Sequence, residues 1–390
     1  MNIKANIQKP QTNYFFYTLI FYSILILYLL PYNLELPHAK IFLPLLTIIL
    51  ILQLFFNKTQ ILITDILLVC SILIVTFINL STYQLFRYSL PICLMLIGFS
   101  GCPQIRIKKD YLIRLCWLAT FTLIYQMIFY RRVEFDGSSR VSLSNGDPNV
   151  SGLFMLLFFF VSCKAKFKPG IILSLVSTVF FLSRNYFLSL LIYLIIIVCE
   201  QKFIKIAKRI NFAVFFILSN LVGFLIGEYF LNFVKIGYAY DTSASRLFSF
   251  NDTSNLARFE ANRFLVTSYQ HDWTLALKGY AGRYDEVFKG IGSLIHNSFL
   301  EVIAYIGIPL GFLYFWAILK VVGGYYTPNN YKYIFPYLFF CLFLHSGLQG
   351  LAPLLFVSIL AMSVEDNKVF TWNNTDPNLT PLLDKETGRG

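Results

Sequence analysis

The chain has 390 residues, of which 57% are hydrophobic, 18% are aromatic and only 13% are charged, and its formal net charge is +12. Soluble domains carry roughly 25% charged residues, so this composition excludes an ordinary soluble protein. The positive charge lies mainly in short loops between apolar segments, where it reflects membrane topology. We therefore expect no nucleic-acid partner.

Apolar segments recur along the chain with the roughly 17 to 25 residues that cross a membrane as a helix. The sequence predicts an all-α integral membrane protein with about twelve transmembrane helices, or about ten if the shortest segments do not span. We place the helices at 13–31, 41–57, 61–80, 85–101, 111–130, 150–163, 169–183, 186–200, 211–232, 298–319, 332–348 and 350–364. The first segment lacks a small-residue cleavage site, which indicates a retained anchor.

The loops between these segments differ in their basic content, which sets the orientation. Cytoplasmic loops are enriched in Lys and Arg, so the N-terminus is predicted to lie inside the cell. The loop 131–149, the turn at Ser183 and Arg184, and the polar segment 233–297 then share the extracytoplasmic side. The inner loops contain Lys58, Arg106, Lys108, Lys109, Lys164, Lys166, Lys168, Lys202, Lys205, Lys208, Arg209, Lys320 and Lys332.

One long polar interruption divides the chain. Residues 1–232 are predicted to hold the first nine transmembrane helices, 233–297 a large periplasmic loop, and 298–364 the last three helices. Irregular polar backbone is disfavoured in lipid, so the loop must lie in water or against protein. The polar tail 365–390 is predicted to be disordered and cytoplasmic.

His296 ends the long loop, directly before an apolar segment. Asn297 is predicted to cap the helix that follows, with Glu301 one turn further in. His296 is then either an interfacial cap or a general base at the mouth of a lipid-facing cavity, because its ordinary pKa lies near neutrality. Gly307 and Gly311 lie four residues apart, which predicts close packing between helices.

Arginines are the candidate anion ligands. Arg184 interrupts a long apolar run, where it is either a snorkelling interfacial residue or a bidentate clamp on a phosphate. Arg140 could reach the same cavity, and Asn149 is predicted to cap the helix that starts beside it. The carboxylates that could accept a hydroxyl proton in place of His296 are Glu134, Asp136 and Asp147.

The long loop contains further candidates. Residues 254–261 are predicted to be helical and to carry Arg258, and 278–284 to form a turn that carries Tyr280 and Arg283. Tyr280 and Trp273 suit stacking on sugar rings, although aromatic residues also form interfacial belts. The remaining arginines, Arg246 and Arg263, are expected to be solvated or to form structural pairs.

The order of these elements resembles the O-antigen polymerase and O-antigen ligase superfamily of bacterial envelope glycan assembly. The resemblance covers roughly residues 130–315. It departs from the family at Asp147, where Asn is frequent, and at Pro309, which precedes Gly311. It rests on Arg140 with Asp147-Pro148-Asn149, on Ser183-Arg184, on Arg258 with Gly279-Tyr280-Ala281-Gly282, and on His296-Asn297 followed by Gly307.

The resemblance implies a GT-C-like glycosyltransferase of the bacterial inner membrane, active on its periplasmic face. Its donor would be an oligosaccharide on undecaprenyl pyrophosphate, with Arg184, Arg258 and His296 as catalytic residues and a chain-length regulator as a further partner. Four scattered histidines and seven cysteines show no metal-ligand spacing, so no metal or cofactor is expected. The substrate-binding positions would be Arg140, Asn149, Trp273, Tyr280, Arg283 and Asn297.

Three functions stay open from the sequence. We favour the polymerase, because the chain is short and rich in Phe and Tyr. A ligase would use the same donor but transfer the glycan to lipid A–core. A lipid-glycan flippase or another transporter should spread charges through many spans and show matched half-repeats. Here Asp65 and Arg114 are the main charges near spans, and the other polar residues concentrate in the outer loops.

Overall fold

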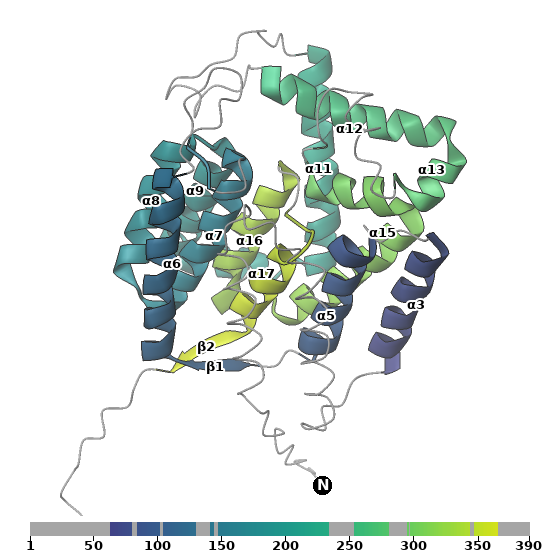
Figure 1. Cartoon of the computed structure of the whole chain (residues 1–390). Coiled ribbons are helices and arrows are strands. Elements are labelled where there is room, and N and C mark those ends of the chain that lie inside the picture. The colour runs from purple at the N-terminus through teal and green to yellow at the C-terminus, as the bar shows by residue number, and fades with distance from the viewer. Residues whose placement is uncertain are drawn as a thin grey trace, which may run out of the picture.

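The structure is a computed structural model that describes residues 63–79, 84–101, 104–129, 141–143, 147–233, 253–280, 295, 297–343 and 347–365 (Figure 1). It is mostly helical. The helices are α3 (Ile63–Asn79), η2 (Leu85–Ser89), α5 (Leu90–Phe99), α6 (Lys109–Phe129), α7 (Pro148–Ala165), α8 (Lys168–Phe181), α9 (Arg184–Val198), α10 (Glu200–Ala207), α11 (Phe212–Phe233), α12 (Thr253–His271), α13 (Trp273–Lys278), α15 (Ser298–Gly324), α16 (Pro328–Leu342) and α17 (Ala352–Ala361). The strands are β1 (Ile105–Lys108) and β2 (Met362–Glu365).

Each predicted span that falls on described residues overlaps a helix, but few of these helices could cross a membrane alone. Four are long and apolar enough, namely α6, α7, α15 and the segment Phe212–Tyr229 of α11. A fifth candidate joins α9 and α10, which meet at an angle of 98°. The described residues are therefore mostly helical, as predicted, and are compatible with an all-α membrane protein, whereas the number of about twelve spans stays a prediction. The spans predicted at 13–31 and 41–57 lie outside the described residues.

The helices differ in how much of their surface other helices cover. Helix α7 is central, with 72% of its apolar window buried, whereas only 17% of the window in α11 is buried. Large apolar side chains stay exposed along the outer helices, including Leu118 and Phe121 on α6 and Ile217 and Leu221 on α11. An exposed apolar surface of this extent is typical of a face that contacts lipid.

Two strands modify the predicted all-α fold. β1 and β2 pair in parallel, with Ile105 opposite Met362 and Lys108 opposite Glu365. The segment predicted as a span at 350–364 therefore ends its helix at Ala361 and continues as a strand. In β1, Ile105 and Ile107 are buried between exposed basic residues, the period-two alternation of a half-buried strand. Figure 1 shows this pair at the opposite end of the molecule from α12 and α13; we call these the strand end and the loop end.

The predicted inner loops gather at the strand end. Lys164 at the end of α7 donates to the carbonyl oxygen of Met362 in β2 (2.9 Å), and Asn330 donates to that of Leu360 (3.3 Å). Tyr326 connects this region to α10 through the Ala207 carbonyl (3.3 Å). The alternation of loops between two ends, predicted from the basic residues, therefore agrees with the structure. Which end faces the cytoplasm stays a prediction from the positive-inside rule.

Candidate functional site

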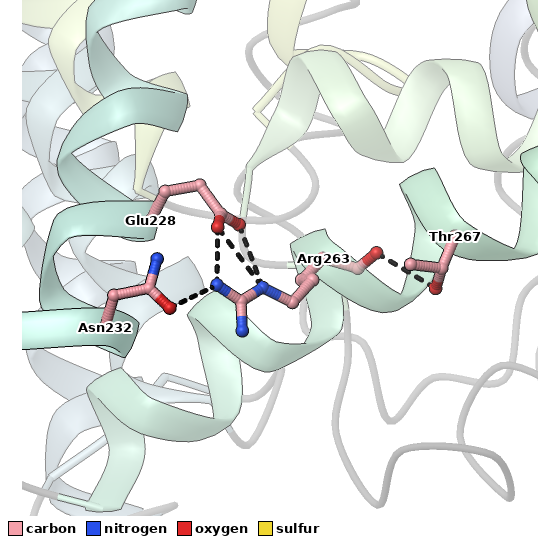
Figure 2. Close-up of polar contacts among 4 residues, drawn as sticks. All are labelled: Glu228, Asn232, Arg263 and Thr267. Carbon is pink, nitrogen blue, oxygen red and sulfur yellow. Dashed lines mark hydrogen bonds and ion pairs between the residues drawn. The ribbon is translucent and has the colours of Figure 1, made fainter.

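Helix α12, which the sequence predicted within the long loop, packs against α11 through a close glycine–phenylalanine contact and an ion pair. A Cβ atom on Gly227 would lie 2.8 Å from the Phe259 ring, so only glycine allows this approach. One turn along, Arg263 contacts both carboxylate oxygens of Glu228, at 2.5 and 3.2 Å, and the Asn232 amide at 2.9 Å (Figure 2). Arg263 is thus a structural pair, as expected from the sequence.

The turn after α13 fits into a break in α15. Gly307 interrupts α15 with φ +76°, and Gly279 ends α13 with φ +66°. A Cβ atom on Gly279 would lie 2.5 Å from the Gly307 amide nitrogen, and one on Gly307 would collide with the Leu277 carbonyl. Both glycines are therefore needed for backbone conformation and close approach. The prediction that these glycines allow close packing between helices holds for Gly307, which approaches Leu277 of α13. It was wrong for Gly311, since a Cβ there would meet only Ile303 of its own helix.

Three carbonyl groups of α15 just before the break accept a hydrogen bond from another element. The Tyr269 hydroxyl donates to Ile303 (2.7 Å), and the Tyr280 backbone N–H donates to Ala304 (2.7 Å). The Gln84 side chain donates to Tyr305 (2.8 Å), whose usual helical donor would be residue 309, a proline without an N–H. Buried polar backbone is thus satisfied by the loop and by the residue before η2.

The start of α9 lies directly against the start of α7. Asp147 caps α7 by accepting from the Asn149 backbone N–H (2.7 Å). The prediction that Asn149 is the cap was therefore wrong, because Asp147 occupies that position. The Asn149 side chain instead accepts a hydrogen bond from the Ser183 hydroxyl (3.1 Å). A Cβ atom on Gly152 would lie 2.9 Å from that of Tyr186, so glycine sets the separation of the two helices.

Arg184 begins α9 and is only 6% exposed. A snorkelling arginine would extend toward water or lipid and would be exposed, so this interpretation does not hold. Ser183 precedes the helix but its side chain makes no capping hydrogen bond to the first turn. The buried neighbour Asn185 donates to the Phe343 carbonyl (2.5 Å), which ties this corner to the end of α16. A cation and a helix N-terminus therefore share one buried position.

A second group of polar residues surrounds the start of α15. Asn297 caps the helix, as predicted, by accepting from the backbone N–H groups of Phe299 (2.9 Å) and Leu300 (3.1 Å). Glu301 is buried and accepts from Gln349 (3.4 Å). Sequence reasoning did not single out Gln349, because its proximity to Glu301 depends on the tertiary fold. From the sequence, Glu301 was assigned only a place one turn into the helix, and in the structure it is a buried carboxylate.

A short segment after α16 joins the polar residues at the start of α9 to those at the start of α15. Phe343 holds Asn185, and the Gly347 backbone N–H donates to the Ser298 hydroxyl (2.9 Å). Four residues separate these anchors, and four residues span at most about 14 Å. The starts of α9 and α15 are therefore tied to one short segment at the loop end. The predicted base, His296, lies outside the described residues.

The remaining predicted site residues are distributed differently. Tyr280 is buried under the break in α15, whereas Trp273 at the start of α13 is 75% exposed. Arg258 lies on α12, one turn before the buried residues Ala261 and Asn262. The positions outside the described residues are Arg140, His296, Arg283, Glu134 and Asp136. Both described neighbours of His296, Ile295 and Asn297, are buried.

The corner at the start of α9 has chemistry that suits an anion. A buried guanidinium beside a helix N-terminus stabilises negative charge, and the low dielectric of the surroundings strengthens that effect. Among the described residues, no group of three His, Cys, Asp or Glu side chains could hold a metal ion. Comparisons of the chain with protein-family models, with curated proteins and with solved structures gave no match. The function is therefore inferred from the residues and their geometry.

Proposed function

We propose that this protein is a glycan polymerase of the O-antigen type in the bacterial inner membrane. It transfers a glycan from undecaprenyl pyrophosphate to a sugar hydroxyl of another lipid-linked repeat unit on the periplasmic face. The observation that carries the proposal is Arg184, a buried arginine at the start of an apolar helix. A buried guanidinium at a helix N-terminus favours an anion, and a lipid pyrophosphate brings an anion to the ends of apolar helices.

The reaction moves charge toward the arginine. The acceptor hydroxyl oxygen bonds to the anomeric carbon of the donor sugar, and the bond from that carbon to the pyrophosphate oxygen breaks. The electron pair stays on the pyrophosphate, and the hydroxyl proton passes to a base, a role we assign to His296. Arg184 stabilises the leaving charge, with Arg258 as the second cation.

Removal of Arg184 is the direct test. The gene is deleted, variants are supplied from a plasmid, and surface glycans are resolved on a gel at matched protein levels. Arg184→Ala should reduce polymerisation about 10²- to 10³-fold, the usual loss for one group that stabilises transition-state charge. Arg184→Lys should recover little, because the bidentate geometry is lost. Arg209→Ala, an exposed arginine at the strand end, is the matched control and should behave as wild type.

The deletion strain separates the possible transferases. A glycan of one repeat unit on the core, with all longer chains missing, indicates the polymerase. Loss of all glycan from the core, with lipid-linked polymer accumulating, indicates the ligase. An unchanged glycan profile in the deletion strain, or a fully active Arg184→Ala variant, contradicts the proposal.

A further inference from the structure

Helix α12 buries an asparagine whose side-chain oxygen lacks a hydrogen bond. Asn262 is only 9% exposed, and its Oδ1 atom has no hydrogen-bond partner among the described residues. A buried amide left unpaired destabilises the folded protein, so such groups are uncommon and need an explanation. Local structure supplies none, because Asn262 lies in the middle of α12, where asparagine is a weak helix former and caps neither end.

The position of Asn262 on α12 shows which way its side chain is directed. With 3.6 residues per turn, Asn262 lies about 60° around the helix from Phe259 and about 20° from Tyr269. The Phe259 ring packs on Gly227 of α11. The Tyr269 hydroxyl donates to the Ile303 carbonyl group of α15 (2.7 Å). Asn262 therefore faces the space between α11 and α15, on the buried side of α12.

Two features connect Asn262 with the candidate site. The helices on either side of it also meet at Phe216 of α11 and Phe299 of α15, whose ring centres are 5.0 Å apart, and Phe299 is the second residue of α15. Arg258 lies four residues before Asn262, so the two positions share one face of α12. Asn262 thus lies on the same face as the second cation of the proposed mechanism.

The setting of the Asn262 amide is suited to recognition. Its helix neighbours Ala261 and Leu265 are buried, so the amide is held among packed groups. An amide fixed in this way loses little conformational entropy when it binds a ligand. The atom without a described partner is an oxygen, which can only accept a hydrogen bond, so the ligand must supply a donor.

We propose that Asn262 accepts a hydrogen bond from a hydroxyl group of the lipid-linked glycan. A sugar hydroxyl supplies the missing donor, whereas an ionised pyrophosphate offers only acceptor oxygens. Asn262 then recognises the sugar that adjoins the pyrophosphate held by Arg258. The identity of the ligand rests on the proposed function, but the burial of Asn262 and its unpaired oxygen do not.

The test uses the full-length protein purified in a neutral detergent. Thermal unfolding is measured while lipid-linked repeat units, extracted from the deletion strain, are added, and separately with undecaprenyl pyrophosphate, which lacks the sugar. Asn262→Leu should bind the glycosylated lipid about tenfold more weakly, the effect of one buried hydrogen bond, and undecaprenyl pyrophosphate as tightly as the wild type does. Without ligand it should unfold at the same temperature or a higher one, because an unpaired amide is replaced by an apolar group of similar size.

Two further variants sharpen this test. Asn262→Asp keeps the acceptor oxygen, so it should retain the wild-type preference for the glycosylated lipid even though its negative charge weakens the binding of both lipids. Thr267→Val is the matched control on the exposed face of α12, where the threonine hydroxyl bonds only to carbonyl groups of its own helix. Its binding of both lipids should equal that of the wild type.

The other outcomes are equally informative. Wild-type binding of the glycosylated lipid by Asn262→Leu would overturn the proposal, and so would a lower unfolding temperature without ligand, which identifies a structural amide. Equal losses for the two lipids would make the phosphate the ligand and would also overturn it. If Arg184→Ala stops polymerisation while Asn262→Leu binds normally, only the assignment of Asn262 fails. If the wild type binds the glycan through Asn262 but polymerises nothing, only the proposed transferase activity fails.

Discussion

The two ends of the molecule are held together by different forces. At the loop end, elements distant in sequence meet through neutral hydrogen bonds and glycine contacts, such as Gln84 with Tyr305 and Gly279 with Gly307. At the strand end, charged groups dominate, and Lys320 of α15 forms a buried ion pair with Asp65 of α3. Directional neutral contacts tolerate little displacement, so the loop end is suited to hold a reacting group in place.

This comparison predicts that one added methyl group disrupts the loop end. Gly307→Ala would force alanine to adopt φ +76° and would push its Cβ into the Leu277 carbonyl. Backbone strain of about 1–3 kcal/mol and overpacking of about 1–3 kcal/mol give an expected loss of about 4 kcal/mol in the free energy of unfolding. The measurement is thermal unfolding in detergent, with the fraction of protein that stays monodisperse as the readout.

Gly311→Ala provides the matched control within the same helix. Its new Cβ would meet the Ile303 side chain at 3.4 Å and no backbone of another helix. We expect a stability close to that of the wild type, since alanine also favours the helix. If the two alanine variants unfold at the same temperature, the loop end does not depend on the glycine contact.

At the strand end, the largest effect should follow from breaking the buried ion pair. Lys320→Met leaves the Asp65 carboxylate buried with the Ser100 hydroxyl (2.6 Å) as its described partner. A fully buried pair loses about 3–5 kcal/mol when one partner is removed; we expect about 2–3 kcal/mol because the Lys320 side chain is 23% exposed. The double variant Asp65→Leu/Lys320→Met should recover most of this stability.

The exposed pair between Arg106 and Glu365 is the control for that measurement. Both side chains are 51% exposed at a separation of 3.7 Å, so Arg106→Gln should change the free energy of unfolding by about 1 kcal/mol or less. Similar losses in Lys320→Met and Arg106→Gln would show that burial does not distinguish the two pairs.

Local sequence patterns predicted much of the fold and part of the site. Apolar periodicity located the described helices, the residues around Arg258 predicted α12, and Asn297 was recognised as a cap because capping involves only the next three residues. Such local patterns could not predict the roles of Gly307 and Gln84. Each depends on a partner far away in sequence, and a glycine four residues before another fits helix packing equally well.

The strand pair shows the same limit. Residues 105–108 alternate between Ile and basic side chains, but four residues are too few to distinguish a strand from the start of a helix. Their partner is the segment 362–365, of which apolar composition assigned residues 362–364 to a membrane span. Long-range pairing therefore decided the local structure, and only the folded chain reveals it.

The smallest predicted effect concerns the ion pair between Arg263 and Glu228, an exception to the neutral contacts of the loop end. This pair fixes α12 to α11 outside the buried site, so Arg263→Ala should leave glycan polymerisation close to wild type, in contrast to Arg184→Ala.

A double-mutant cycle with Glu228→Gln isolates the coupling between the two charges. Both side chains are partly exposed, and the Debye length falls from about 10 Å at 0.1 M salt to about 3 Å at 1 M. The coupling should therefore fade as salt rises across this range, whereas the loss caused by Gly307→Ala should not change. A coupling that persists in 1 M salt would show that the bidentate contact is shielded from solvent. Loss of polymerisation in Arg263→Ala, at normal protein level, would move Arg263 into the candidate site beside Arg258.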